Sequence, residues 1–135
     1  MPEVKTYDPS QGSLIVGGSI IGSWREATVV EDEDGFTFDT DTNSGESTRT
    51  KNSSKLGTFT IILPQASLDN GTLSAFKIAG SLISCLFKDN SGNSIHVMPQ
   101  GTVVKSADAG YGKEAGDREW TVRGNLDVNV LGGNN

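Results

Sequence analysis

The 135-residue sequence has few of the residues that most often carry catalysis or bind metals. It contains one cysteine, Cys85, and one histidine, His96. A single cysteine forms no intrachain disulfide, and with one histidine it cannot build the usual zinc site. The segment SLISCLF around Cys85 is apolar, so a buried, inert thiol is expected. A catalytic triad would depend on His96, and no G-x-S-x-G turn is present, so we predict that the protein is not an enzyme.

Long hydrophobic runs and phosphate-binding loops are also missing. No stretch approaches the roughly 18 apolar residues of a membrane span, and the polar start lacks the apolar centre of a signal peptide. We therefore expect a soluble product made in the cytoplasm, without membrane insertion. Neither a G-x-G-x-x-G nor a Walker motif occurs, so no cofactor is expected. The net charge of −6 argues against a basic nucleic-acid-binding patch, although an acidic surface suits a protein that lies near DNA without binding it.

Helix-forming residues are too sparse for a helical bundle, whereas threonine, valine, isoleucine and 17 glycines favour β structure. We predict one domain over residues 1–135: an antiparallel β-barrel or sandwich of about seven or eight strands with one flanking helix. The helix is expected at residues 67–80, capped by Ser67 or Asp69 and ended by Gly80. Strands are expected at residues 14–16, 20–21, 25–33, 56–65, 81–89, 94–106 and 118–133, with Gly17 and Gly18 forming a tight hairpin between the first two.

Periodicity identifies the residues expected in the core. LGTFTIILP alternates with period two, the helix places two apolar residues three apart, and WTVRGNLDVNV alternates over eleven residues. The predicted core residues are Phe59, Ile61, Leu63, Leu73, Phe76, Trp120, Val122, Leu126 and Val128. The polar face of the last strand is expected to carry Thr121, Arg123, Asn125, Asp127 and Asn129. Such a face is typical of an exposed surface sheet, and also of the wall of a water-filled channel.

The segment FDTDTNSGES, residues 38–47, resembles the start of a calcium-binding loop. With Asp39 at position 1, Asp41 and Asn43 fit positions 3 and 5. Position 6 is serine rather than glycine, position 12 is Thr50 rather than glutamate, and the flanking residues favour strands. We therefore predict no metal site and interpret the segment as the polar tip of a long hairpin.

Three blocks of the sequence together resemble one protein family. They are LIVGGSIIGSW, then GESTRTKNSSKLGTFTIILPQAS, and finally YGKEAGDREWTVRGNLDVNVLGGNN, and the resemblance runs from Tyr7 to Asn135. The most specific piece is GKEAGDREW, residues 112–120. In this order the blocks are similar to the tail tube proteins of contractile-tailed bacteriophages. Trp24 departs from the family pattern, which leaves its local packing open.

The resemblance implies an Hcp-like fold and a virion protein that is assembled in the host cytoplasm. It implies homo-hexameric rings that stack into a tube, through which DNA passes without specific binding. The expected partners are the tail sheath, tape measure and baseplate or terminator proteins. The polar face of the last strand would line the lumen.

Three further segments are assigned on the same basis. A hairpin over residues 29–60 would reach a neighbouring subunit or ring, and the tails at residues 1–12 and 131–135 would make further contacts. The candidate contact residues of the hairpin are Asp39, Asp41, Asn43, Glu46, Arg49 and Lys51.

Two alternatives stay open at this point. One is a related ring-forming tube or tail component, such as a secretion-system tube subunit, a terminator or a baseplate protein. The other is a soluble β-sandwich that binds carbohydrate or a receptor.

Overall fold

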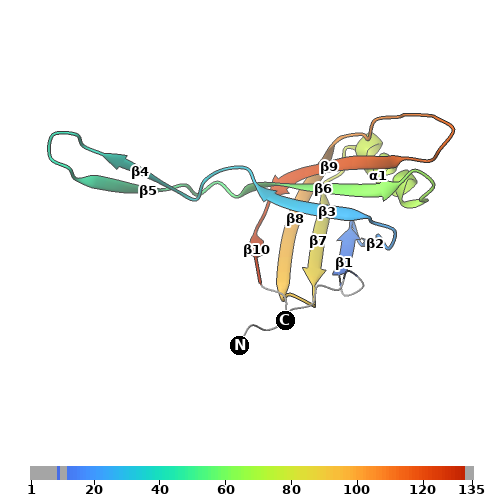
Figure 1. Cartoon of the computed structure of the whole chain (residues 1–135), viewed down its shortest axis with the longest axis horizontal. Coiled ribbons are helices and arrows are strands. Elements are labelled where there is room, and N and C mark those ends of the chain that lie inside the picture. The colour runs from blue at the N-terminus through green and yellow to red at the C-terminus, as the bar shows by residue number, and fades with distance from the viewer. Residues whose placement is uncertain (1–8, 10–11, 133–135) are drawn as a thin grey trace.

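The computed structural model describes residue 9 and residues 12–132, which contain ten strands and one α-helix (Figure 1). Eight strands form one antiparallel sheet in the order β2-β1-β7-β8-β9-β6-β3, with β10 also pairing with β8, and β4 pairs with β5 in a separate ribbon. The predicted mainly-β class is confirmed, and the sheet forms a sandwich rather than a closed barrel. The elements are β1 Gly12–Val16, β2 Ser19–Ile20, β3 Glu26–Glu31, β4 Phe36–Thr40, β5 Ser47–Lys51, β6 Leu56–Pro64, α1 Asp69–Ala79, β7 Ile83–Asp89, β8 Ser94–Lys105, β9 Asp117–Asn125 and β10 Val128–Val130.

The long strand β8 forms the corner of the sandwich. Its first half pairs with β7 and β10, and its second half pairs with β9. Gly101 and Gly124 lie opposite each other where the strand bends, and a Cβ on Gly124 would lie only 2.7 Å from the Cα of Gly101. The paired glycines therefore permit a close approach of the two backbones. We call β2, β1, β7, the first half of β8 and β10 the β7 half-sheet, and β9, β6 and β3 the β6 half-sheet (Figure 1).

The hydrophobic core lies between the inner faces of the two half-sheets. Alternate residues of β6 and β9 point into it, as the period of two requires. Phe76 is half-buried and packs against the core. The buried apolar residues are Leu14, Val16, Ile21, Phe59, Ile61, Leu63, Leu73, Ile83, Cys85, Met98, Val103, Trp120, Val122 and Leu126.

The helix α1 runs from Asp69 to Ala79 and contacts β8. It ends at Gly80, which has a φ of 63° and whose N–H bonds the carbonyl groups of the last turn. At the start, the hydroxyl of Ser67 accepts the N–H of Asp69 at 3.2 Å, while Leu68 stands at the N-cap without a side-chain bond. No helix in the described part of the chain is long and apolar enough to cross a membrane.

A buried hydrogen-bond chain fixes the start of α1 to the sheet. The indole N–H of Trp120 on β9 donates to Asn70 Oδ1 at 3.0 Å. The Asn70 amide group in turn donates to the carbonyl oxygens of Pro64 and Ser67, at 2.9 and 3.0 Å. Trp120 and Asn70 are 3% and 9% exposed, so these bonds satisfy groups that water cannot reach.

The alternation of the last strand does not continue through its full length. β9 ends at Asn125, and the chain turns at Leu126 and Asp127 before β10 resumes along β8. Beyond this break the phase shifts, so Val128 is 37% exposed and the prediction that it lies in the core is wrong. Asn129 lies opposite the buried His96, and these directly paired residues share one face of the sheet. Asn129 therefore does not lie on the face predicted for it.

The thiol of Cys85 is expected to be unreactive in the folded protein. It is fully buried, and burial raises its pKa to about 12. Because the thiolate is the reactive form, iodoacetamide at pH 8 should not label the native protein. Labelling should reach one equivalent in urea, which mass spectrometry measures. Rapid labelling of the native protein would contradict the buried position.

Candidate assembly surface

The outer face of the β6 half-sheet is polar and rich in threonine. Strand pairing places its outward side chains in rows that cross β3, β6 and β9. Such threonine rows are stable on a wet sheet surface because the hydroxyl groups bond each other or water while the methyl groups pack. The rows are Glu26, Ile62 and Glu119; Thr28, Thr60 and Thr121; and Val30, Thr58 and Arg123.

Arg123 carries an ion pair on this face. Its guanidinium donates to Asp32 Oδ2 at 3.0 Å, and the Thr58 hydroxyl donates to the same carboxylate at 2.9 Å. Asp32 directly follows β3, and its N–H bonds the carbonyl of Leu56. The group therefore ties the chain that leaves the sheet to the polar face. Since the Arg123 side chain is 45% exposed, the ion pair contributes at most about 1 kcal/mol.

The predicted polar residues of the last strand separate into two groups. Thr121, Arg123 and Asn125 alternate with the buried residues of β9, so they share its outer face. Asp127 is exposed in the break after β9. Asn129 is engaged elsewhere: His96 Nδ1 donates to its amide oxygen, and its amide group donates to Glu31 Oε1 at 2.7 Å.

The link from His96 through Asn129 to Glu31 joins three strands. His96 lies on β8, Asn129 on β10 and Glu31 on β3, so the link holds the short strand β10 against both half-sheets. The sequence analysis did not find it, because the partners lie 33 and 98 residues apart. Nothing in the sequence singled out Asn129, because it is one of several polar residues that alternate with apolar ones near the end of the chain.

The β4–β5 ribbon projects from the body as an arm (Figure 1). We define the arm as residues 32–55, and every residue of its two strands is exposed. The arm contains all six predicted contact residues of the hairpin. At its base, Asn52 N–H donates to the carbonyl of Gly35 at 2.8 Å, so the two connecting segments stay together.

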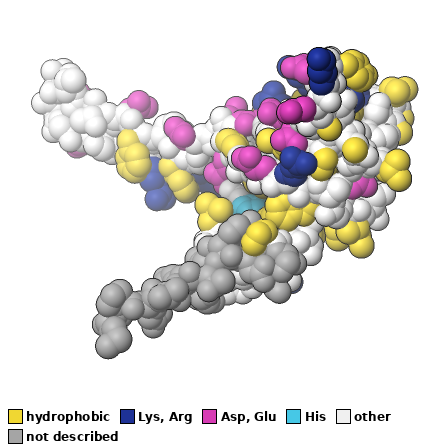
Figure 2. Space-filling model, turned by 45° about the vertical axis from the view of Figure 1, so that its right-hand side comes forward, with side chains coloured by type: hydrophobic (Ala, Val, Ile, Leu, Met, Phe, Trp, Pro, Cys, Tyr) yellow, Lys and Arg dark blue, Asp and Glu magenta, His cyan; other side chains and the backbone are white. Residues whose placement is uncertain are grey.

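The two faces of the arm differ in chemistry. Strand pairing places Phe36 opposite Lys51 and Phe38 opposite Arg49, which puts two aromatic rings and two cations on one face. The Arg49 guanidinium lies 4.7 Å from the centroid of the Phe36 ring. The opposite face carries Asp39 with threonines, and Figure 2 shows hydrophobic and basic side chains together on the lower side of the arm.

The tip of the arm is a turn that Asp41 holds together. Its carboxylate accepts the N–H of Asn43 at 2.9 Å, and its carbonyl accepts the N–H of Gly45, which has a φ of 71°. The residues that resemble a calcium loop therefore have a local structural role. Within residues 9 and 12–132, no group of three or more acidic, histidine or cysteine side chains is placed to hold a metal ion.

The turn is expected to respond to acid. The Asn43 N–H and then the Ser44 hydroxyl stabilise the carboxylate and hold the pKa of Asp41 below its ordinary 3.8. The turn therefore keeps this stabilisation above pH 3.8 and loses it as the pH falls through the lowered pKa. The amide resonance of Asn43 in NMR spectra should shift with a midpoint below 3.8. The variant Asp41→Asn should abolish the shift, whereas a midpoint above 3.8 in the native protein would contradict this account.

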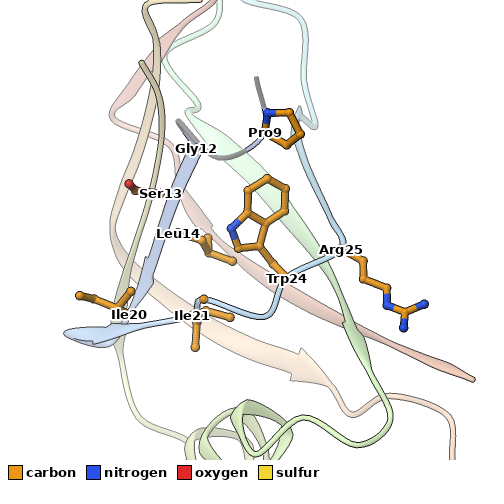
Figure 3. Close-up of a pocket in the computed structure, with 9 residues that line it drawn as sticks. Pro9, Gly12, Ser13, Leu14, Ile20, Ile21, Trp24 and Arg25 are labelled. Carbon is orange, nitrogen blue, oxygen red and sulfur yellow. The ribbon is translucent and has the colours of Figure 1, made fainter. Parts of the chain in front are cut away.

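A pocket of about 270 Å³ lies between β1 and the segment that enters β3 (Figure 3). Trp24 stands in this seam, with its ring 5.3 Å from that of Phe87 in an edge-to-face contact at 82°. Arg25 lies at the pocket and pairs with Asp117 at 3.0 Å. The seam separates the two edges of the sheet, and Trp24 covers the core where a closed barrel would have paired strands.

Comparison with known proteins supports the fold but gives no sequence family. No protein-family model matches the chain, and no curated protein matches it in sequence. Among solved structures, the chain is similar to the anti-feeding prophage cap, described as the tube terminating cap. The TM-score is 0.66 and the identity is 6%, over 93% of this chain and 91% of that chain. The chain therefore shares its fold with that protein.

Proposed function

We propose that this chain is a structural, non-enzymatic component of a phage tail or a related tube assembly, and that it forms the ring that terminates the tube. The similarity to a tube terminating cap over nearly the full length of both chains carries this proposal. The likeness covers 93% of this chain and 91% of that chain, so nearly the whole fold is shared.

The comparison favours a terminator over the tube subunit that the sequence blocks suggest. The two differ in one physical property. A tube subunit binds further copies of itself above and below, whereas a terminator ends the stack of rings. The tube subunit is the second candidate, and the three sequence blocks support it.

In the proposed ring, the outer face of the β6 half-sheet lines the central opening. Thr121, Arg123 and Asn125 lie on this face, and Asp127 lies at its end. Uncharged threonine rows with few exposed cations hold DNA weakly, because phosphate binding depends on lysine and arginine. Arg123, the cation in these rows, is already paired with Asp32.

The arm provides the contact between subunits in this proposal. The arm lies on one side of the molecule and the surface that receives it lies on another, so the contact is heterologous. Such a contact forms a closed ring when the rotation between neighbouring copies closes. Six copies would make the ring. The partners would be the tail tube and sheath, the tape measure and the baseplate, and the location would be the tail of a virion or of a prophage-encoded particle.

Negative-stain electron microscopy of the purified protein tests the proposal. We expect closed rings of uniform diameter that do not extend into tubes. Long tubes of uniform bore would identify the tube subunit instead. A protein that stays monomeric at high concentration would contradict both candidates and would favour the soluble β-sandwich module.

A further inference from the structure

The outer face of the β7 half-sheet carries an aliphatic row that the proposed ring lining does not explain. Strand pairing aligns five side chains in register across five neighbouring strands. They point away from the core, because the residues beside them in β1, β7 and β8 are buried on the inner face. The aliphatic row consists of Ile20, Ile15, Leu86, Val97 and Val128.

Within the described part of the chain, this row is open at its two ends, and Ile15, Leu86 and Val97 between them are half-buried. Ile20 is 75% exposed and Val128 is 37% exposed, at the two ends of the row. The neighbouring row adds Ile95 and Val130, and Lys88 is its charged member. An antiparallel sheet with one face on the core usually presents a polar outer face to water, as the β6 half-sheet does. A continuous aliphatic face indicates a surface that a protein partner covers.

The aromatic face of the arm is a second surface with exposed apolar side chains. Phe36 and Phe38 are 48% and 69% exposed on its aromatic face. A two-stranded ribbon is marginally stable by itself in water, so packing against another surface would stabilise it. Aromatic side chains are favoured as interface anchors because each buries a large area at low entropic cost.

The dimensions of the two surfaces agree. A row across five strands spans four inter-strand spacings, or about 19 Å, and a five-residue strand such as β4 is about 17 Å long. Figure 1 shows the arm extending away from its own body, so it does not cover its own row. A second copy of the chain supplies an arm of these dimensions, with its aromatic face exposed.

We propose that the aliphatic row is the docking site for the arm of a neighbouring copy, which lays Phe36 and Phe38 across it. Arg49 and Lys51 flank the rings, and the exposed carboxylate of Asp127 lies next to Val128 at one end of the row. The contact is heterologous, so each copy both gives an arm and receives one. This inference rests on the proposed ring, since it names the surfaces that join its subunits.

Disulfide trapping tests the contact. The variant Phe38→Cys/Val97→Cys places one thiol on the aromatic face and one in the row, and the buried Cys85 does not compete. Mild oxidation should give a ladder of linked chains. Two controls move one thiol: Thr37→Cys/Val97→Cys uses the other arm face, and Phe38→Cys/Thr60→Cys uses the polar half-sheet. The fraction of chains linked into the ladder should be about ten times that in either control, because disulfides form only at Cα separations of roughly 4–7 Å.

Electron microscopy of the same samples separates this inference from the proposed function. Rings without the ladder would overturn the docking site and leave the ring intact. A ladder without rings would support the docking site and contradict the ring. An equal fraction of linked chains in either control would overturn the assignment of the contact to the aromatic face of the arm and the aliphatic row. If Val97→Cys lowers the melting temperature, Ile20→Cys at the exposed end of the row replaces it, and the same criteria apply.

Discussion

Replacing Trp120 by alanine is expected to lower the free energy of unfolding by about 3–5 kcal/mol. The side chain is 3% exposed in the core, and its indole N–H bonds Asn70 Oδ1 at 3.0 Å. The substitution leaves a cavity and also leaves a buried amide oxygen without its donor, and both effects act in the same direction. Urea denaturation monitored by circular dichroism measures the change.

The variant Trp120→Phe separates the two effects. It keeps most of the apolar volume but removes the indole N–H, so it should cost about 1–3 kcal/mol through the unsatisfied oxygen of Asn70. The alanine variant should cost more than the phenylalanine variant. A loss below about 1 kcal/mol for the alanine variant would contradict the role of Trp120 in joining α1 to the sheet.

Removing the arm is expected to abolish ring formation and to leave the body folded. Residues 36–51 would be replaced by Asn-Gly between Gly35 and Asn52, which already share a backbone hydrogen bond of 2.8 Å. The strands removed are fully exposed, so the melting temperature should change little. Two aromatic anchors at about 2 kcal/mol each would weaken association roughly a thousandfold. Sedimentation velocity measures the shift from rings to monomers.

A matched variant keeps the arm and removes only its rings. Phe36→Thr/Phe38→Thr preserves strand propensity, so the ribbon should remain while association weakens as in the deletion. Thr37→Ala/Thr50→Ala changes the opposite face and should leave the rings intact. Normal rings from the arm-deleted protein would contradict the role of the arm.

Local patterns in the sequence predicted the main elements well. The glycine pair between short apolar runs forms a hairpin, with φ of 59° at Gly17 and 83° at Gly18. The alternation in LGTFTIILP matches β6, and Gly80 ends the helix in the left-handed conformation. Each of these features depends on residues close in sequence, so the chain alone contains the signal.

Features that depend on distant partners were missed or wrong. The last strand alternates in sequence beyond Asn125, but the structure turns there because the chain leaves β6 at the end of β9 and then pairs with the first half of β8 as β10. Val128 then faces outward, and Asn129 faces inward because His96 and Glu31 bond its side chain. Only the tertiary structure brings those three residues together.

The aliphatic row illustrates the same limit. The run SLISCLF has apolar residues on both faces, which is typical of a strand covered on both sides. The sequence therefore contained a signal for a second covered face. It did not show that Ile15, Val97 and Val128 align with Leu86, because register between strands is set by pairing over long distances.

Native mass spectrometry tests the central claim, that this chain closes into rings, most directly. At tens of micromolar protein, the account predicts one dominant species with about six times the 14.2 kDa mass of the chain. A broad distribution of masses, with no single preferred number of subunits, would indicate open filaments. A spectrum that contains only the 14.2 kDa monomer under the same conditions would contradict the account.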